Sequence, residues 1–346
     1  MFCTQKNCLI TPIVFGKICI SGIFALLILN CLLSFYYHLP LHINNSLHTT
    51  DYVWEKNSHW IKWTEGISWG KLDANGFNNA KVVENPDVLI LGSSHMEATN
   101  VFQNENTAFL LQSYFEKENI PLTVYNHGIS GHHFLKCCKY LNNNTKDDSL
   151  KYVIIETSKV DFSETEIDNF FNNKIDFTSS YTSGIIGFLQ HLPLFRLLWS
   201  QLEHGLLQLF LSKKTNLVSI SNTVTDDTKI KNSYNRLFEY IKENSNGKRI
   251  IIFYHPTGTP NISGNLTFDT NENSLSLFSD FAEKYGIDFI DLTKDTEKLW
   301  QTEHKTTHGF CTGTAFSGHF NRNGHKIAAE NLAKKIITQE KTNVAF

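Results

Sequence analysis

Ser94 is the first residue whose type and setting predict chemistry. It follows Gly92 in the run LGSSHMEATN, directly after an apolar stretch. In doubly wound folds, the carboxyl end of a strand is where ligands bind. A serine that opens a helix there also directs its backbone N–H toward a developing oxyanion. The setting predicts a nucleophile, although a serine after a glycine is more often only a turn or a helix cap.

Two further stretches could complete an acyl-transfer site. In NHGISGHHF, Gly128 and Gly131 bracket a turn whose amides could donate to an oxyanion, and the alternative is a plain strand-to-helix turn. In SGHFNRNGHKIAAENLA, His319 directly precedes an expected helix. His319 can act as the general base for Ser94 only if the fold brings both residues to one edge of a sheet.

The elements that must position these residues begin after Pro86, where short apolar runs alternate with amphipathic stretches. Strands that are apolar on both faces and alternate with helices predict an α/β fold with a parallel sheet covered on both sides. The expected strands are 87–91, 122–126, 152–156, 249–254 and 288–292. The last expected helix lies in NGHKIAAENLAKKIITQ. This arrangement puts the serine, glycine and histidine stretches at strand ends.

The N-terminal part predicts a membrane anchor. Ile18–Tyr37 contains no charged residue, and about 20 helical residues span the ~30 Å hydrocarbon core of a bilayer. Lys6 and Lys17 precede it, so the positive-inside rule places the N-terminus in the cytoplasm and the main domain in the periplasm or outside the cell. A cleaved signal peptide is the alternative, but the exit YYHLPLHINN lacks a small-residue cleavage pattern.

These signals divide the chain into a cytoplasmic tail (1–17), a transmembrane helix (18–38), a stalk (39–86) and an α/β domain (87–340). The stalk holds four tryptophans, which favours packing on the domain or on the membrane surface. An insertion at about 161–228 has a strongly apolar centre. Its expected roles are to cover the sheet, to cap the active site, to lie on the membrane or to dock on a membrane partner.

Charge and metal-ligand spacing exclude several classes of function. A formal net charge of −3 gives no basic footprint for nucleic acid. The spacing of His304, His308, His319 and His325 matches no helical metal site, so we expect neither a metal nor another cofactor.

Three of the seven cysteines lie in the α/β domain, too few for a disulfide scaffold. Cys311 could pair with Cys137 or with Cys138 in an oxidising compartment. Buried free thiols are the equal alternative.

Taken together, the three stretches resemble the SGNH (GDSL-type) superfamily of esterases and acyltransferases. Gly92–His95 is similar to the family's G-D-S-[LHN] block, Asn126–Gly131 to its N-x-G-x-S-G block, and His319–His325 to its H-x-N-x-x-G-[HYN] block. The blocks occur in the family's order, on the expected elements. The resemblance covers about Asp87–Gln339.

The resemblance implies a flavodoxin-like three-layer sandwich with Ser94 as nucleophile and His319 as general base. It also implies an oxyanion hole formed by the backbone N–H groups of Ser94 and Gly131. The candidates for positioning substrate or loops are His95, Asn126 and Asn321.

This sequence departs from the family pattern at two places. The family's acid stands two or three residues before the histidine, where this chain has Ser317 and Phe316. The acid is therefore missing, or comes from elsewhere, or the site works as a Ser–His dyad. The acidic residues near strand ends are Asp161, Glu156 and Asp291, and spacing does not choose among them. The family's G-x-N-D block is replaced by ETSKVDF, which lacks the asparagine that donates to the oxyanion.

The expected function is that of a membrane-anchored, extracytoplasmic serine esterase or O-acyltransferase. It would act on an acyl ester of a cell-envelope glycan through a Ser94 acyl-enzyme, with a membrane O-acyltransferase as a candidate partner. Simple hydrolysis is a second enzymatic alternative. A catalytically impaired SGNH-like protein that binds glycans or serves as a scaffold is the alternative from another class.

Overall fold

The computed structural model describes residues 12–36, 43–44, 52–54, 56–62, 65–172, 192–195 and 227–344. The chain forms two compact units. One comprises Met1–Leu39 and Ser180–Thr215, and the other Pro40–Ser179 and Asn216–Phe346. The stalk expected at 39–86 thus belongs, from Pro40, to the unit that holds the sheet. The apolar centre of the insertion lies, apart from a short piece at 192–195, outside the described residues.

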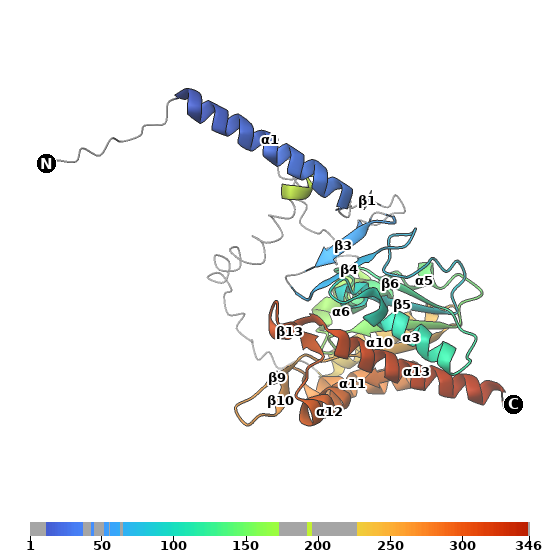
Figure 1. Ribbon diagram of the computed structural model, residues 1–346. Coiled ribbons are helices and arrows are strands. Elements are labelled where there is room, and N and C mark those ends of the chain that lie inside the picture. Colours follow the sequence, from blue (N-terminus) through green and yellow to red (C-terminus); the bar gives the residue numbers. More distant parts are fainter. Residues whose placement is uncertain are drawn as a thin grey trace. The chain divides into compact units, whose positions relative to one another are not determined.

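Helix α1 (Pro12–Tyr36) forms the described N-terminal part of the first unit (Figure 1). It begins at a proline, which suits the first turn of a helix because the missing N–H would have no partner there. Its stretch Pro12–Leu33 is long and apolar enough to cross a membrane. The helix begins six residues before the expected span at Ile18.

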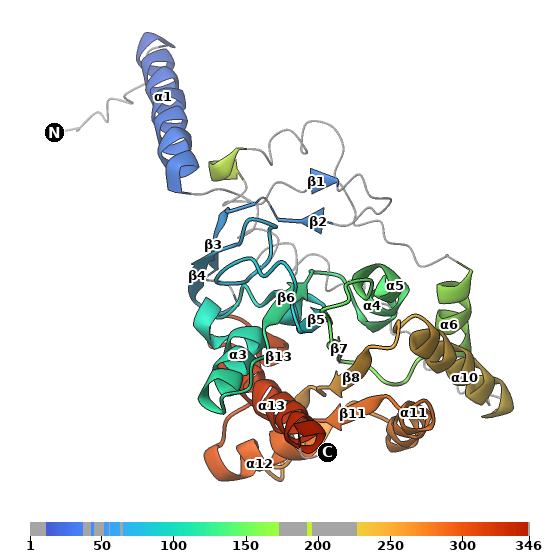
Figure 2. The same ribbon diagram turned by 90° about the vertical axis from the view of Figure 1, so that its right-hand side faces the viewer.

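The second unit is built on a five-stranded parallel sheet, shown in Figure 2. Its strands are β5 (Val88–Gly92), β6 (Val124–Gly128), β7 (Tyr152–Thr157), β8 (Arg249–Tyr254) and β11 (Asp288–Asp291). Their spatial order is β11-β8-β7-β5-β6. Counted along the chain, this is the order 2-1-3-4-5 of flavodoxin-like folds. The predicted strands and the predicted fold class are confirmed.

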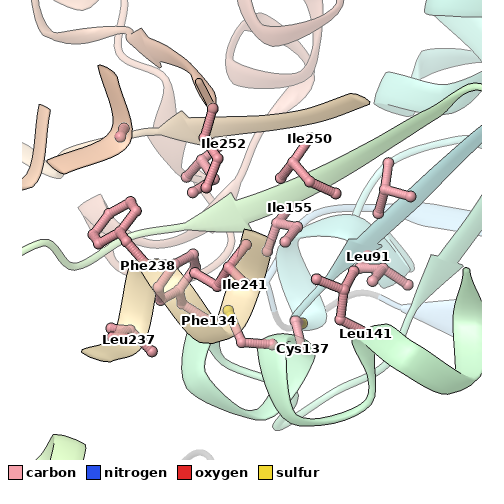
Figure 3. Close-up of a cluster of buried hydrophobic side chains, with 14 of the residues drawn as sticks. Leu91, Phe134, Cys137, Leu141, Ile155, Leu237, Phe238, Ile241, Ile250 and Ile252 are labelled. Carbon is pink, nitrogen blue, oxygen red and sulfur yellow. The ribbon is translucent and has the colours of Figure 1, made fainter. Parts of the chain in front are cut away.

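Helices cover both faces of the sheet. One face bears α4 (Phe134–Lys139), α6 (Glu164–Phe171), α10 (Asp227–Glu243) and α11 (Glu272–Lys284), and the other bears α3 (Thr107–Lys117) and α13 (Arg322–Val344). Successive strand residues point to opposite faces. Leu91, Ile155 and Ile252 therefore pack with α4 and α10 (Figure 3), whereas their neighbours along the strands pack with α3 and α13.

The remaining elements were not anticipated individually. They are β1 (Ile43–Asn44), β2 (Tyr52–Val53), β3 (His59–Lys62), β4 (Ser68–Lys71), α2 (Ser94–Glu97), η1 (Gln103–Glu105), α5 (Leu141–Asn144), β9 (Gly258–Pro260), β10 (Leu266–Phe268), α12 (Thr293–Glu303), β12 (His308–Gly309) and β13 (Ala315–Phe320). Strands β3 and β4 pair as an antiparallel hairpin within the expected stalk. Trp60 of this hairpin is buried, and Trp69 is 60% exposed beside the Phe102 ring. The stalk therefore packs on the domain, as one of the two alternatives predicted.

The turn from β5 into α2 depends on a close approach of β6. Gly128 ends β6, and a Cβ atom on it would overlap the backbone of Met96 and Glu97 in α2. The side chain of Asn126 reinforces this contact, because its Nδ2 donates to Met96 O at 2.7 Å while its Oδ1 accepts from Gly128 N at 3.0 Å. Glycine and asparagine at these positions thus hold α2 against the end of the sheet.

We expect Gly128→Ala to lower the free energy of unfolding by about 1–3 kcal/mol, the usual cost of overpacking, because the new methyl group meets backbone that cannot rotate away. Urea denaturation measures the change. Ser130→Ala is the matched control, since Ser130 is exposed in the same loop. An unfolding free energy for Gly128→Ala within about 0.5 kcal/mol of wild type, the usual range for surface substitutions, would contradict this packing.

Candidate active site

Ser94 and His319 come together although 225 residues separate them. Ser94 opens α2 just beyond β5, and His319 lies in β13 just before α13. The Ser94 Oγ is 2.8 Å from His319 Nε2. A hydroxyl nucleophile and its general base make a contact of this length, and both side chains are only partly buried.

A carboxylate binds the other side of the His319 ring, and it is Glu65. Its Oε2 is 2.7 Å from His319 Nδ1, and its Oε1 accepts the His319 backbone N–H at 2.9 Å. Of the three alternatives left open by the sequence, the geometry favours an acid from elsewhere. The three acidic residues considered from the sequence are not the partners of His319.

Glu65 fixes the hydrogen positions on the ring. A carboxylate accepts hydrogen bonds, so Nδ1 of His319 carries the hydrogen and Nε2 presents its lone pair to the Ser94 hydroxyl. Burial opposes the charge of Glu65, but the hydrogen bonds from His319 outweigh it and lower the pKa of Glu65 to about 2. The carboxylate is therefore ionised at neutral pH, the state that orients a catalytic imidazole.

The backbone around Glu65 is held from both sides. Asn100 Nδ2 donates to Glu65 O at 2.6 Å, and Gly66 N donates to Thr312 Oγ1 at 2.9 Å. Gly66 has φ +94°, and a Cβ on it would overlap Asn100 O. Gly318 has φ +86°, and a Cβ on it would overlap Glu65 Oε1. The glycine directly before His319 thus makes room for the acid.

Two backbone N–H groups are free to receive an oxyanion. Within the described part of the chain, neither Ser94 N nor Gly131 N has a hydrogen-bond acceptor. Gly131 is exposed and has φ +82°. These are the two donors that the sequence resemblance implies. The segment that directly follows β7 in the sequence, SKVDF, offers no asparagine, and the hydroxyl of Thr157 at the end of β7 donates to Lys159 O.

Glu97 of helix α2 binds the loop that carries Gly131. This carboxylate is 3% exposed. Its Oε2 accepts from Ser130 N at 2.6 Å and its Oε1 from Trp54 Nε1 at 2.6 Å. The segment expected as a stalk therefore contacts the site at two points, with Trp54 bound to Glu97 and Glu65 bound to His319.

The three candidates for positioning all make contacts within the protein. His95 Nδ1 accepts from Phe320 N at 3.1 Å, which links α2 to β13. Burial, helped by the neighbouring His255, lowers the pKa of His95 to about 3, so its ring is neutral. Asn126 holds α2 as described above. Asn321 Oδ1 accepts from Asn323 N at 2.9 Å, which caps the start of α13.

A group of three histidines lies beside the dyad, and the sequence analysis did not single it out. The ligand atoms of His95, His255 and His308 lie within 4.8 Å of one another. An imidazole that binds a metal keeps a hydrogen on its other nitrogen and donates it to an acceptor. His95 does the opposite, because its Nδ1 accepts the Phe320 N–H. The donor set therefore does not fit a three-histidine metal centre.

The described cysteines of the domain are free thiols. Cys137 and Cys138 are buried, and Cys311 is exposed. Burial raises the pKa of both buried thiols. The alternative of buried free thiols therefore holds for Cys137 and Cys138, whereas Cys311 is a free thiol on the surface.

No protein-family model matches this chain, and no curated protein matches it. Similar solved structures exist. A two-domain esterase (CEX) active on acetylated mannans, co-crystallised with mannopentaose, matches at 12% identity and TM-score 0.41, over 72% of this chain and 48% of that one. An acetyl xylan esterase, AlAXEase, matches at 13% identity and TM-score 0.40, over 72% of this chain and 99% of that one.

A peptidoglycan O-acetylesterase also matches, at 13% identity and TM-score 0.34, over 64% of this chain and 47% of that one. This chain thus spans about half the length of the first and the third of these proteins. What it does is inferred from its own residues.

The Glu65–His319 contact predicts a pH-dependent stability. Because the pKa of Glu65 falls from 4.5 to about 2 on folding, its contribution is complete above about 4.5 and is lost as the pH falls toward 2. We expect the difference in unfolding free energy between wild type and Glu65→Gln to be constant above that range and to shrink toward pH 2. Urea denaturation across the range measures it. A difference that does not depend on pH would contradict the contact.

A substitution of Glu97 tests whether its hydrogen bonds position the loop that carries Gly131, which we call the glycine loop. Both of its partners are N–H donors, so a glutamine, with one acceptor oxygen, must leave one of them facing an NH₂ group. We expect Glu97→Gln to slow reaction of Ser94 with a fluorophosphonate about tenfold, as one buried donor is left unpaired. Trp54→Phe removes one donor, so the double variant should recover most of the rate. A double variant slower than Glu97→Gln would refute this arrangement.

Proposed function

We propose that this protein is a serine esterase or O-acyltransferase that acts through a Ser94 acyl-enzyme. The observation that supports this is one continuous chain of hydrogen bonds, from Glu65 through His319 to Ser94. Each group in it has the partner that its role requires. The acid orients the imidazole, and the imidazole presents a free lone pair to the hydroxyl.

The reaction follows from these positions. Ser94 Oγ bonds to the carbonyl carbon of an ester while its proton passes to His319 Nε2. Glu65 stabilises the resulting imidazolium, and the N–H groups of Ser94 and Gly131 stabilise the oxyanion. The leaving alcohol then takes the proton from His319, and an acyl-enzyme remains. Water or a sugar hydroxyl, deprotonated by the same nitrogen, then bonds to the acyl carbon. The bond from that carbon to Ser94 Oγ breaks, and Oγ takes the proton back from His319.

The absent third-block asparagine bears on rate more than on type of reaction. Removing one oxyanion donor from a serine hydrolase costs about 10²–10³ in kcat. A site with two backbone donors and a complete Ser–His–Glu chain therefore retains the means for acyl transfer. This favours an enzyme over the scaffold alternative, because Glu65 supplies an acid and only the missing asparagine remains of the two departures from the family pattern.

The substrate class and location belong to the same proposal. The resemblance to SGNH proteins and the apolar helix α1 support an enzyme anchored by a single span, with a cytoplasmic N-terminus and a periplasmic or extracellular domain. Its substrate is then an acyl ester of a cell-envelope glycan, and a membrane O-acyltransferase is the proposed partner. Neither a cofactor nor nucleic acid has a part in this chemistry.

The test is covalent labelling of the full chain in detergent. We expect a fluorophosphonate to add once to wild type and not to Ser94→Ala. His319→Ala and Glu65→Gln should lower the rate constant by about 10²–10⁴, because a misoriented or absent base cannot take the proton. Intact mass against time measures it, and hydrolysis of an activated acetyl ester gives kcat and KM for the same variants.

Glu84→Gln is the matched control, because Glu84 is an exposed glutamate of the same N-terminal segment. It should react like wild type. A folded wild-type protein that is not labelled, and that hydrolyses no activated ester, would leave the glycan-binding scaffold as the better account. Labelling that persists in Ser94→Ala would place the nucleophile elsewhere.

A further inference from the structure

Under the dyad lies a buried chain of polar side chains that the reaction does not use. Glu156 Oε1 is 2.6 Å from His255 Nε2, and His255 Nδ1 is 3.1 Å from His308 Nε2. His308 Nδ1 is in turn 3.0 Å from Thr307 Oγ1. All four residues are at most 3% exposed. We call this set of Glu156, His255, His308 and Thr307 the buried relay.

One assignment of hydrogens satisfies every group in the relay. Glu156 is a carboxylate, since its second oxygen accepts the Ser93 backbone N–H at 2.7 Å. In this assignment His255 donates from Nε2 to that carboxylate and accepts on Nδ1. His308 donates from Nε2, and its Nδ1 accepts the Thr307 hydroxyl. Burial and the neighbouring His255 hold the pKa of His308 well below its usual value, so the His308 ring is neutral.

The two ends of the relay reach opposite halves of the active site. At one end Glu156 binds Ser93 N, the residue before the nucleophile. At the other end Thr307 O accepts the N–H of Asn321, two residues after His319. Between them, His308 pairs with Phe320 across the β12–β13 hairpin. The nucleophile and the base come from distant parts of the sequence, and the relay connects their supports.

From this connection we propose that the buried relay is a positioning network, which fixes the turn of Ser94 relative to the strand of His319. The proposal rests on the proposed function, because positioning has a meaning only if the dyad reacts. Glu156, His255 and His308 touch neither substrate nor Ser94 Oγ in this account. They act through Ser93 and through the β12–β13 hairpin.

Burial makes such a network sensitive to loss of any member. Desolvation alone would raise the pKa of Glu156, but the hydrogen bonds from His255 and Ser93 lower it to about 2. A charge that is buried in this way is stabilised by its hydrogen-bond partners. Removing one partner leaves a buried polar group unpaired. The unpaired group draws in water or shifts, and a displacement of about 1 Å at a reacting atom can cost 10²-fold in rate.

Comparing Glu156→Gln with Glu156→Leu distinguishes the effect of the hydrogen bonds of Glu156 from the effect of the volume that its side chain fills. In Glu156→Gln the amide oxygen accepts from Ser93 N and the NH₂ donates to His255, if both histidines move their hydrogens from Nε2 to Nδ1. His308 then donates to the Thr307 hydroxyl, and all bonds persist. Glu156→Leu and His255→Leu allow no such rearrangement.

We expect Glu156→Gln to label with fluorophosphonate within about tenfold of wild type. Glu156→Leu and His255→Leu should fall by about 10²-fold, in kcat and not in KM for an activated acetyl ester. The double leucine variant should cost no more than either single one, because both break the same chain. If Glu156→Leu does not fold, Thr307→Val serves instead, with an expected loss of about three- to tenfold.

His325→Leu is the matched control. This histidine is equally buried, packs against the Phe320 ring and binds Thr107, but is no member of the relay. It should lower Tm and leave the labelling rate unchanged. If Glu156→Leu and His255→Leu lower Tm but are labelled within twofold of the wild-type rate, the relay contributes only to stability and the positioning role is wrong.

The ¹⁵N NMR signals of labelled histidine imidazoles test the relay without relying on activity. In wild type the hydrogen that each of His255 and His308 donates within the relay should lie on Nε2, and Glu156→Gln should move both hydrogens to Nδ1. Unchanged tautomers in Glu156→Gln would overturn the relay. So would one equivalent of zinc, measured by elemental analysis and lost in His255→Leu. If wild type shows the expected tautomers but no labelling, the proposed function fails and the positioning role fails with it.

Discussion

The two hydrogen bonds that His319 donates to Glu65, one from ring Nδ1 and one from the backbone N–H, are the interaction on which the site depends. They fix which ring nitrogen carries the hydrogen, and thereby turn the other toward Ser94. Three nearby residues make this contact possible. Gly318 has no side chain to block the carboxylate, Gly66 turns the chain behind it, and Asn100 holds its carbonyl.

The architecture brings the three parts of the site together in different ways. The parallel sheet places Ser94 and the glycine loop at one edge, as it does for any residues that follow strands β5 and β6. His319 reaches that edge on a hairpin outside the sheet, and Glu65 on a second hairpin from the N-terminal side. Glu97 and the buried relay then join these separate pieces beneath the reacting atoms.

The sequence was sufficient to predict those features that a short local pattern of residues determines. Apolar runs predicted the five strands of the sheet. Serine and glycine after two of these strands marked Ser94 and Gly131, and the position of His319 before the last helix marked it as a candidate base. Glu65 was missed because nothing local marks it: it lies 254 residues from His319, in a segment expected as a stalk. The one sequence feature linked to this contact is Gly318, because a side chain at that position would overlap the Glu65 carboxylate. The buried histidines were missed for a similar reason, since His255 and His308 meet only in the folded chain.

The central claim is that Glu65, His319 and Ser94 act as one unit in acyl transfer. Mixing the full chain with an activated acetyl ester, quenching within one turnover and mapping the modified peptide by mass tests it most directly. The account predicts one acetyl group on the peptide that contains Ser94, formed much more slowly in Glu65→Gln. An acetyl group on another residue, or equal rates in wild type and Glu65→Gln, would contradict it.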